Sequence, residues 1–126
     1  MAAPRLQLLK QTMAFERAFA AAGGHLQMGL DPTGGGCALF GFGDQRAIQL
    51  LVEAGFTPVE AIRIMTGNSA RILGRADRIG TITVGKLADL VVLDGDPTTD
   101  IANTKKIHAV WHRGKKAAGP VETFTP

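Results

Sequence analysis

A single apolar strand without neighbours is the feature that most constrains this chain. The stretch HLQMGL, residues 25–30, predicts a short strand that ends at the carboxylate Asp31. Helical patterns lie on both sides of it, so the strand would be buried on both faces. Strands of this kind belong to parallel sheets, which need neighbouring strands. The first half of the chain offers no second strand, so the sequence is typical of the end of a larger α/β fold.

Two helices are expected around this strand. Apolar residues recur at steps of three and four over residues 6–22, which predicts an amphipathic helix stopped by Gly23 and Gly24. After a glycine-rich loop, Asp44 is expected to be the N-cap of a second helix, and Gly55 to close it.

The stretch FTPVEAIRIMT carries the strongest local helix signal. Thr57 is expected to be the N-cap, Pro58 the first helical residue, and Glu60 the partner that completes a capping box. A short helical piece over 69–73 should follow, with Asn68 as its cap. Thr66, Asn68 and Ser69 are therefore interpreted as structural residues.

The hydrophobic period changes after residue 78. Residues 79–97 predict a short strand, a turn at 85–86 and a β-branched strand over 89–93. A further strand is expected at 106–111, before the turn 113–115. Three such strands can pair antiparallel, but they form only a thin sheet. Lys86 and Asp89 are expected to make a turn contact that fixes it.

Composition excludes several classes of protein. The 126 residues are 45% hydrophobic and 20% charged, which fits one globular domain. The net charge is +3, and with no tyrosine and few aromatic residues there is little sign of a stacking platform for nucleic acid. The single cysteine, Cys37, excludes an internal disulfide. No apolar run reaches the ~20 residues of a membrane span, and the N-terminus is not typical of a signal peptide. A cytoplasmic protein is expected.

Three long motifs carry a family resemblance. They are GLDPTGGG at 29–36, LLVEAGFTPVEAIRIMTGNSARILG at 50–74 and IGTITVGKLADLVVLDGDP at 79–97. They resemble the C-terminal part of the metal-dependent amidohydrolase superfamily, which includes imidazolonepropionases and dihydroorotases. The closing IHAVWHRGKK at 107–116 is similar to the last strand of that family.

The resemblance implies the C-terminal portion of a (β/α)8 barrel plus strands of a small β-sandwich. Residues 1–76 would supply the last barrel strand and its helices, 77–116 part of the sandwich, and 117–126 a tail. The family completes the sandwich with its N-terminal segment. Its active site lies at the C-terminal ends of the barrel strands, as such barrels generally have it.

The resemblance also implies a role for Asp31. It matches the aspartate that ends the eighth strand, which ligates a divalent metal (zinc is expected) and acts as general base on the metal-bound water. The activity implied for the complete enzyme is hydrolysis of a C–N bond in a cyclic amide or a related amide. The family commonly has threonine or serine before this aspartate, and here the residue is Leu30.

The family's principal metal ligands have no counterpart in this chain. They are a His-x-His pair on the first strand, a lysine or glutamate on the fourth, and histidines on the fifth and sixth. His25 would lie at the closed end of the barrel. In an extended strand, His108 and His112 would be roughly 13 Å apart and could not chelate one ion. The chain alone is therefore expected to be inactive.

The glycine-rich loop and the carboxylate before it allow more than one interpretation. Gly34, Gly35 and Gly36 would belong to a flexible loop over the substrate, or to a plain connector, and the loop lacks the endings of phosphate-binding motifs. Cys37 is interpreted as an inert thiol. From the residues alone, Asp31 could simply cap the turn at Pro32.

An alternative from another class is a stand-alone interaction or assembly module. A partner chain carrying the missing strands, or a second copy, would then cover its apolar faces. For the complete enzyme, a small-molecule amide is the expected substrate, and neither nucleic acid nor a membrane is an expected partner.

Overall fold

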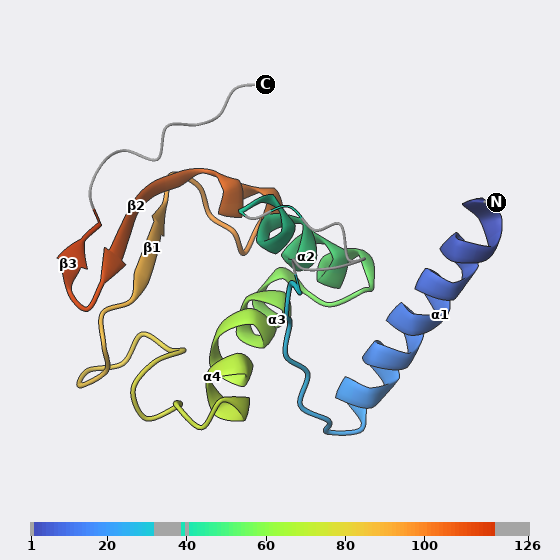
Figure 1. Cartoon of the computed structure of the whole chain (residues 1–126), viewed down its shortest axis with the longest axis horizontal. Helices are drawn as coiled ribbons and strands as arrows, with labels where there is room; N and C mark the ends of the chain where they lie inside the picture. Colours follow the sequence, from blue (N-terminus) through green and yellow to red (C-terminus); the bar gives the residue numbers. More distant parts are fainter. Residues whose placement is uncertain (1, 32–38, 40, 118–126) are drawn as a thin grey trace.

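The chain forms a mixed helix and strand structure whose helices lead and whose small sheet follows (Figure 1). The computed structural model describes residues 2–31, 39 and 41–117. The helices are α1 (Ala2–Ala21), α2 (Phe42–Glu53), α3 (Pro58–Arg63) and α4 (Ser69–Ile72), with a π-helical turn η2 (Ile64–Asn68) and a 3-10 turn η3 (Ile101–Lys105). The strands are β1 (Leu90–Leu93), β2 (Ile107–His112) and β3 (Lys115–Lys116). No helix in the described part is long and apolar enough to cross a membrane.

Helix α2 begins earlier than its sequence predicts. Its N-cap is Gly41, with φ 78° and no side-chain cap bond, so the expectation that Asp44 caps it is wrong. Asp44 lies in the first turn instead, where a carboxylate is also favourable because it faces the positive end of the helix dipole. The helix ends where predicted, since Gly55 takes the left-handed φ of 96° that glycine tolerates.

The capping box of α3 is confirmed. The Thr57 hydroxyl accepts a hydrogen bond from the Glu60 amide at 3.2 Å, and the Glu60 carboxylate accepts one from the Thr57 amide at 2.7 Å. Asn68 is not a cap, because its backbone is helical and α3 continues through η2 into α4. The Ser69 hydroxyl donates to the Ile64 carbonyl at 2.9 Å, so a side chain helps to satisfy the widened turn.

The strand predicted at 25–30 is absent from the described residues. A strand needs a neighbour to form its hydrogen-bond ladder, and the described chain places none beside this segment. Half-buried and exposed residues nevertheless alternate along this segment, as they would in a strand. Leu26, Met28 and Leu30 are half-buried, whereas the residues between them are exposed: His25, Gln27, Gly29 and Asp31.

The sheet has the order β1-β2-β3 and is antiparallel throughout. The short strand predicted before the turn at 85–86 did not form. Ile82 is 92% exposed and Val84 fully so, and no backbone hydrogen bond among the described residues joins this stretch to a neighbouring strand. The two other predicted strands are confirmed as β1 and β2. Val92 faces Ala109 and Leu93 faces Ile107, so His108 is an extra residue in β2, as in a β-bulge.

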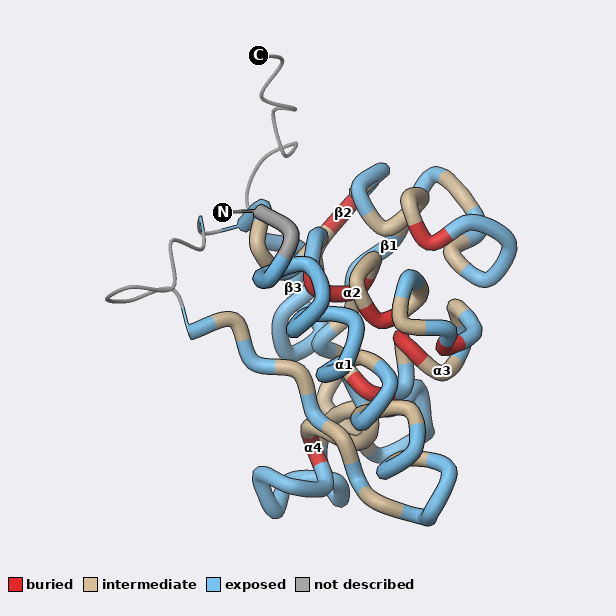
Figure 2. The backbone as a smooth tube through the Cα atoms, turned by 90° about the vertical axis from the view of Figure 1, so that its right-hand side faces the viewer, coloured by how far each residue is buried: buried red, intermediate tan, exposed pale blue. Residues whose placement is uncertain are grey.

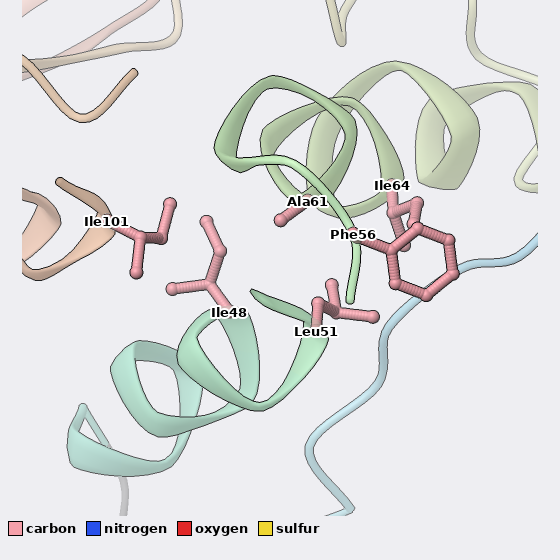
Figure 3. Packing of buried hydrophobic residues seen from close by; sticks show 6 residues of the cluster. All are labelled: Ile48, Leu51, Phe56, Ala61, Ile64 and Ile101. Atoms are coloured by element: carbon pink, nitrogen blue, oxygen red, sulfur yellow. The ribbon is translucent and has the colours of Figure 1, made fainter. Parts of the chain in front are cut away.

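The core is small and lies where α2, α3 and η3 meet. Six buried residues form it: Ile48, Leu51, Phe56, Ala61, Ile64 and Ile101 (Figure 3). Leu26 and Met28 pack against this cluster. Buried stretches are few along the tube of the backbone, and most of α1 is exposed (Figure 2). The core thus anchors segment 25–31 from one side and leaves its other side open.

Candidate functional site

Asp31 lies at the exit of the half-buried segment, on its exposed side. Its φ is 42°, in the left-handed region, which aspartate tolerates better than most residues. The segment before it is held by Leu26 and Met28 on the core. Gly29 and Asp31 are exposed, whereas Leu26, Met28 and Leu30 are half-buried. Asp31 is therefore an exposed residue at the end of a segment that the core anchors.

An open apolar groove of about 420 Å³ lies next to this segment. Segment 28–30 and Leu39 form one part of its wall, and α2 supplies the rest: Phe42, Gly43, Arg46, Ala47 and Leu50. A Cβ at position 43 would overlap the end of the Leu30 side chain, so a larger residue there would require Leu30 to move. Sequence reasoning missed Gly43 and Arg46, and the only signal was a glycine within the first turn of a helix.

Arg46 is the cation of this groove, and Glu53 holds it. The Arg46 guanidinium donates two hydrogen bonds to the carboxylate of Glu53, which lies about two helical turns further along α2. These bonds lower the pKa of Glu53 and raise the pKa of Arg46. Both side chains are about half exposed, so solvent screens the pair. The pair fixes the direction of the arginine more than it stabilises the fold.

The predicted substrate loop lies largely outside the described residues. Gly34, Gly35, Gly36 and Cys37 fall in the part that is not described, so their expected roles stay predictions. Phe42 is the first residue of α2 and is 65% exposed. It lines the groove instead of filling the core.

Each of the three histidines contacts a different side chain. Arg71 donates to Nε2 of His25 at 3.2 Å. Nδ1 of His108 lies 3.0 Å from the Asp94 carboxylate, and Nδ1 of His112 lies 2.9 Å from the Asp89 carboxylate.

Asp89 and Lys86 do not make the contact that the sequence predicts. The Asp89 carboxylate also accepts a hydrogen bond from the Arg113 amide at 2.8 Å, which joins the residue before β1 to the turn after β2. Lys86 donates to the Thr81 hydroxyl at 2.6 Å instead. The reason is distance along the chain: the partner that completes Asp89 comes from β2, which local spacing does not reveal.

The described residues do not by themselves fit a metal ion. A catalytic metal takes about three protein ligands, and no group of three His, Cys, Asp or Glu side chains in the described ranges could hold one. The Asp31 carboxylate lies next to residues that line an apolar groove. Any ion at this place would need ligands from elsewhere.

Comparisons with known proteins agree on one relationship. The model of the amidohydrolase family matches residues 1–117. An imidazolonepropionase of Streptococcus pyogenes is 29% identical over 122 residues, covering 90% of this chain and 27% of the relative. A solved Xaa-Pro dipeptidase with bound methionine superposes with a TM-score of 0.74 at 28% identity, covering 87% of this chain and 25% of that one.

Two further solved structures are similar over a smaller part. Molinate hydrolase has a TM-score of 0.63 at 32% identity, over 77% of this chain and 23% of that one. Phenylurea hydrolase B has a TM-score of 0.58 at 40% identity, over 66% of this chain and 19% of that one. The chain thus spans about a quarter of the length of the relatives it matches.

Proposed function

The chain belongs to the amidohydrolase family, and on that premise we propose that it supplies the C-terminal quarter of a hydrolase that cleaves a C–N bond. Residues 1–76 would then be the last barrel strand with its helices, and 77–116 part of a small β-sandwich. The observation that carries this proposal is the alternation over 25–31: apolar side chains on the core, and Asp31 at the exit on the open side. This alternation supports the proposal because a barrel strand whose neighbours are elsewhere would show the same pattern.

Asp31 is the general base in this proposal. Its carboxylate takes a proton from the water whose oxygen bonds to the amide carbon, and returns it to the nitrogen as the C–N bond breaks. The carboxylate is exposed at the end of an anchored segment, so it can meet a water and a substrate held by other strands. The groove along Met28, Leu30 and Phe42 offers an apolar wall beside it.

The family generally uses a divalent metal. We propose that Asp31 is one ligand of that ion, with zinc as the metal, and that the other ligands come from the remainder of the fold. The described residues hold no set of three possible ligands, so by themselves they would neither bind the ion tightly nor hydrolyse an amide. The substrate would be a cyclic amide or a related amide.

A chimera tests the role of Asp31. Residues 1–117 would replace the matched segment of the Xaa-Pro dipeptidase, and hydrolysis of an Xaa-Pro dipeptide, molinate, a phenylurea and imidazolonepropionate would be measured. We expect hydrolysis of at least one substrate, and Asp31→Asn should lower kcat/KM by roughly 10²–10⁴. Asp77→Asn, at an exposed position after α4, is the matched control.

Full activity of the Asp31→Asn chimera would refute the assigned base. The isolated chain, supplied with zinc, should show no turnover. A chain that binds its complementary polypeptide while the complex stays inactive would favour the interaction module over the enzyme.

A further inference from the structure

Helix α1 carries two apolar faces, and the described structure uses only one of them. Met13, Arg17 and Ala20 recur at steps of four and three and are half-buried. The Arg17 guanidinium lies 4.6 Å from the centre of the Phe56 ring and 3.7 Å from the Glu60 carboxylate. Ala20 packs against the core cluster. This face therefore attaches the helix to the rest of the chain.

The second face is largely exposed. Leu8, Phe15 and Phe19, which we call the outer stripe, lie seven and four residues apart and so share one side of the helix. They are 64%, 69% and 42% exposed. The two rings stack, with centroids 6.3 Å apart. At 100° per residue this stripe points away from the face that holds Arg17, and α1 stands out from the body of the molecule (Figure 1).

A helix with apolar residues on both sides is normally enclosed between two layers. Contact between the outer stripes of two copies would be small for a dimer. The exposed parts of two outer stripes amount to on the order of 700 Å², taking ~200 Å² for each side chain. A stable protein pair buries about 1,200–2,000 Å².

We propose that the outer stripe is the surface on which the rest of an amidohydrolase fold docks. The matched relatives carry about three quarters of their length beyond the part that this chain matches, which is ample to provide the missing layer. This inference rests on the proposed function, because both take the remainder of the fold as the partner of this chain. It adds that the residues of the outer stripe recognise that partner. The stripe is uncharged, so recognition is by apolar burial.

Capture by a defined polypeptide tests this. The probe is the Xaa-Pro dipeptidase lacking the segment that this chain matches, fixed to beads and offered residues 1–126. We expect capture of the unchanged chain. The variant Leu8→Gln/Phe15→Gln/Phe19→Gln should lose capture at least tenfold, and the control Ala14→Gln/Ala21→Gln, at exposed alanines on another side of α1, should keep it. Far-UV circular dichroism checks that both variants keep their helices.

Three results would overturn the inference. The first is no capture of the unchanged chain, and the second is equal capture of the stripe variant. The third is a dimer of twice 13.3 kDa in light scattering that becomes a monomer in the stripe variant. The last result would assign the stripe to a second copy. Failure here is separable from failure of the proposed function: capture with an inactive chimera refutes only the enzyme, and an active chimera with stripe-independent capture refutes only the docking surface.

Discussion

At Gly80, the loop before the sheet contacts the turn between α3 and α4 closely. Its φ is 90°, and a Cβ there would collide with the Cβ of Ala70. It would also lie 3.1 Å from the Thr66 carbonyl oxygen and 3.2 Å from Cα of Gly67. Gly85 provides a matched control, since its φ is 91° and a Cβ there would meet nothing within 4 Å. The two glycines share the backbone conformation and differ in contact.

The substitutions Gly80→Ala and Gly85→Ala therefore separate strain from contact. A left-handed backbone costs a residue with a Cβ about 1–2 kcal/mol, and this cost applies to both variants. Gly80→Ala adds the cost of overpacking, typically about 1–3 kcal/mol. We expect the free energy of unfolding to fall by about 2–5 kcal/mol for Gly80→Ala and by about 1–2 kcal/mol for Gly85→Ala.

Urea unfolding followed by circular dichroism measures the difference, provided that the slope with denaturant is unchanged. Equal losses for the two variants would refute the close contact at Gly80. A loss for Gly85→Ala as large as the one expected for Gly80→Ala would show that backbone strain alone accounts for both.

Three further predictions concern the core, the capping box and the sheet. Leu51→Ala should lower the free energy of unfolding by about 2–5 kcal/mol because it opens a cavity, whereas Leu73→Ala, at a 65% exposed site, should cost far less in the same urea assay. The pKa of Glu60 lies below its ordinary 4.5, mainly because its carboxylate accepts a hydrogen bond from the Thr57 amide. The ionised carboxylate therefore stabilises the fold above pH 4.5. This contribution is lost as the pH falls through the lower pKa of the folded state. In Glu60→Gln, the thermal unfolding midpoint should therefore fall less steeply as the pH is lowered. An unchanged pH dependence would exclude the Glu60 carboxylate as its source. Asp89→Ala should lower the free energy of unfolding by about 1 kcal/mol and speed hydrogen exchange at the Arg113 amide, which donates to the Asp89 carboxylate. Unchanged exchange at the Arg113 amide would contradict this hydrogen bond.

The local signals of the sequence were reliable where the interacting groups lie within a few residues of each other. The capping box joins Thr57 to Glu60 and formed as predicted, and Gly55 ended α2 as predicted. Asp44 was misplaced because a carboxylate is favourable both at the N-cap and in the first turn, so the residue type alone does not decide between the two positions.

What the sequence by itself determined, then, is the set of helices, the two paired strands and the family to which the residues belong. Only the tertiary structure decided which sides are covered. Segment 25–31 has the alternation of a strand, yet no ladder forms, because a ladder needs a second chain segment that the described residues do not place beside it. His108 became an extra residue in β2, and Asp89 found its partners in β2 and the turn after it, because register is set between strands rather than along one. The outer stripe of α1 follows the same logic: spacing makes the helix, but which face is buried depends on what lies beside it.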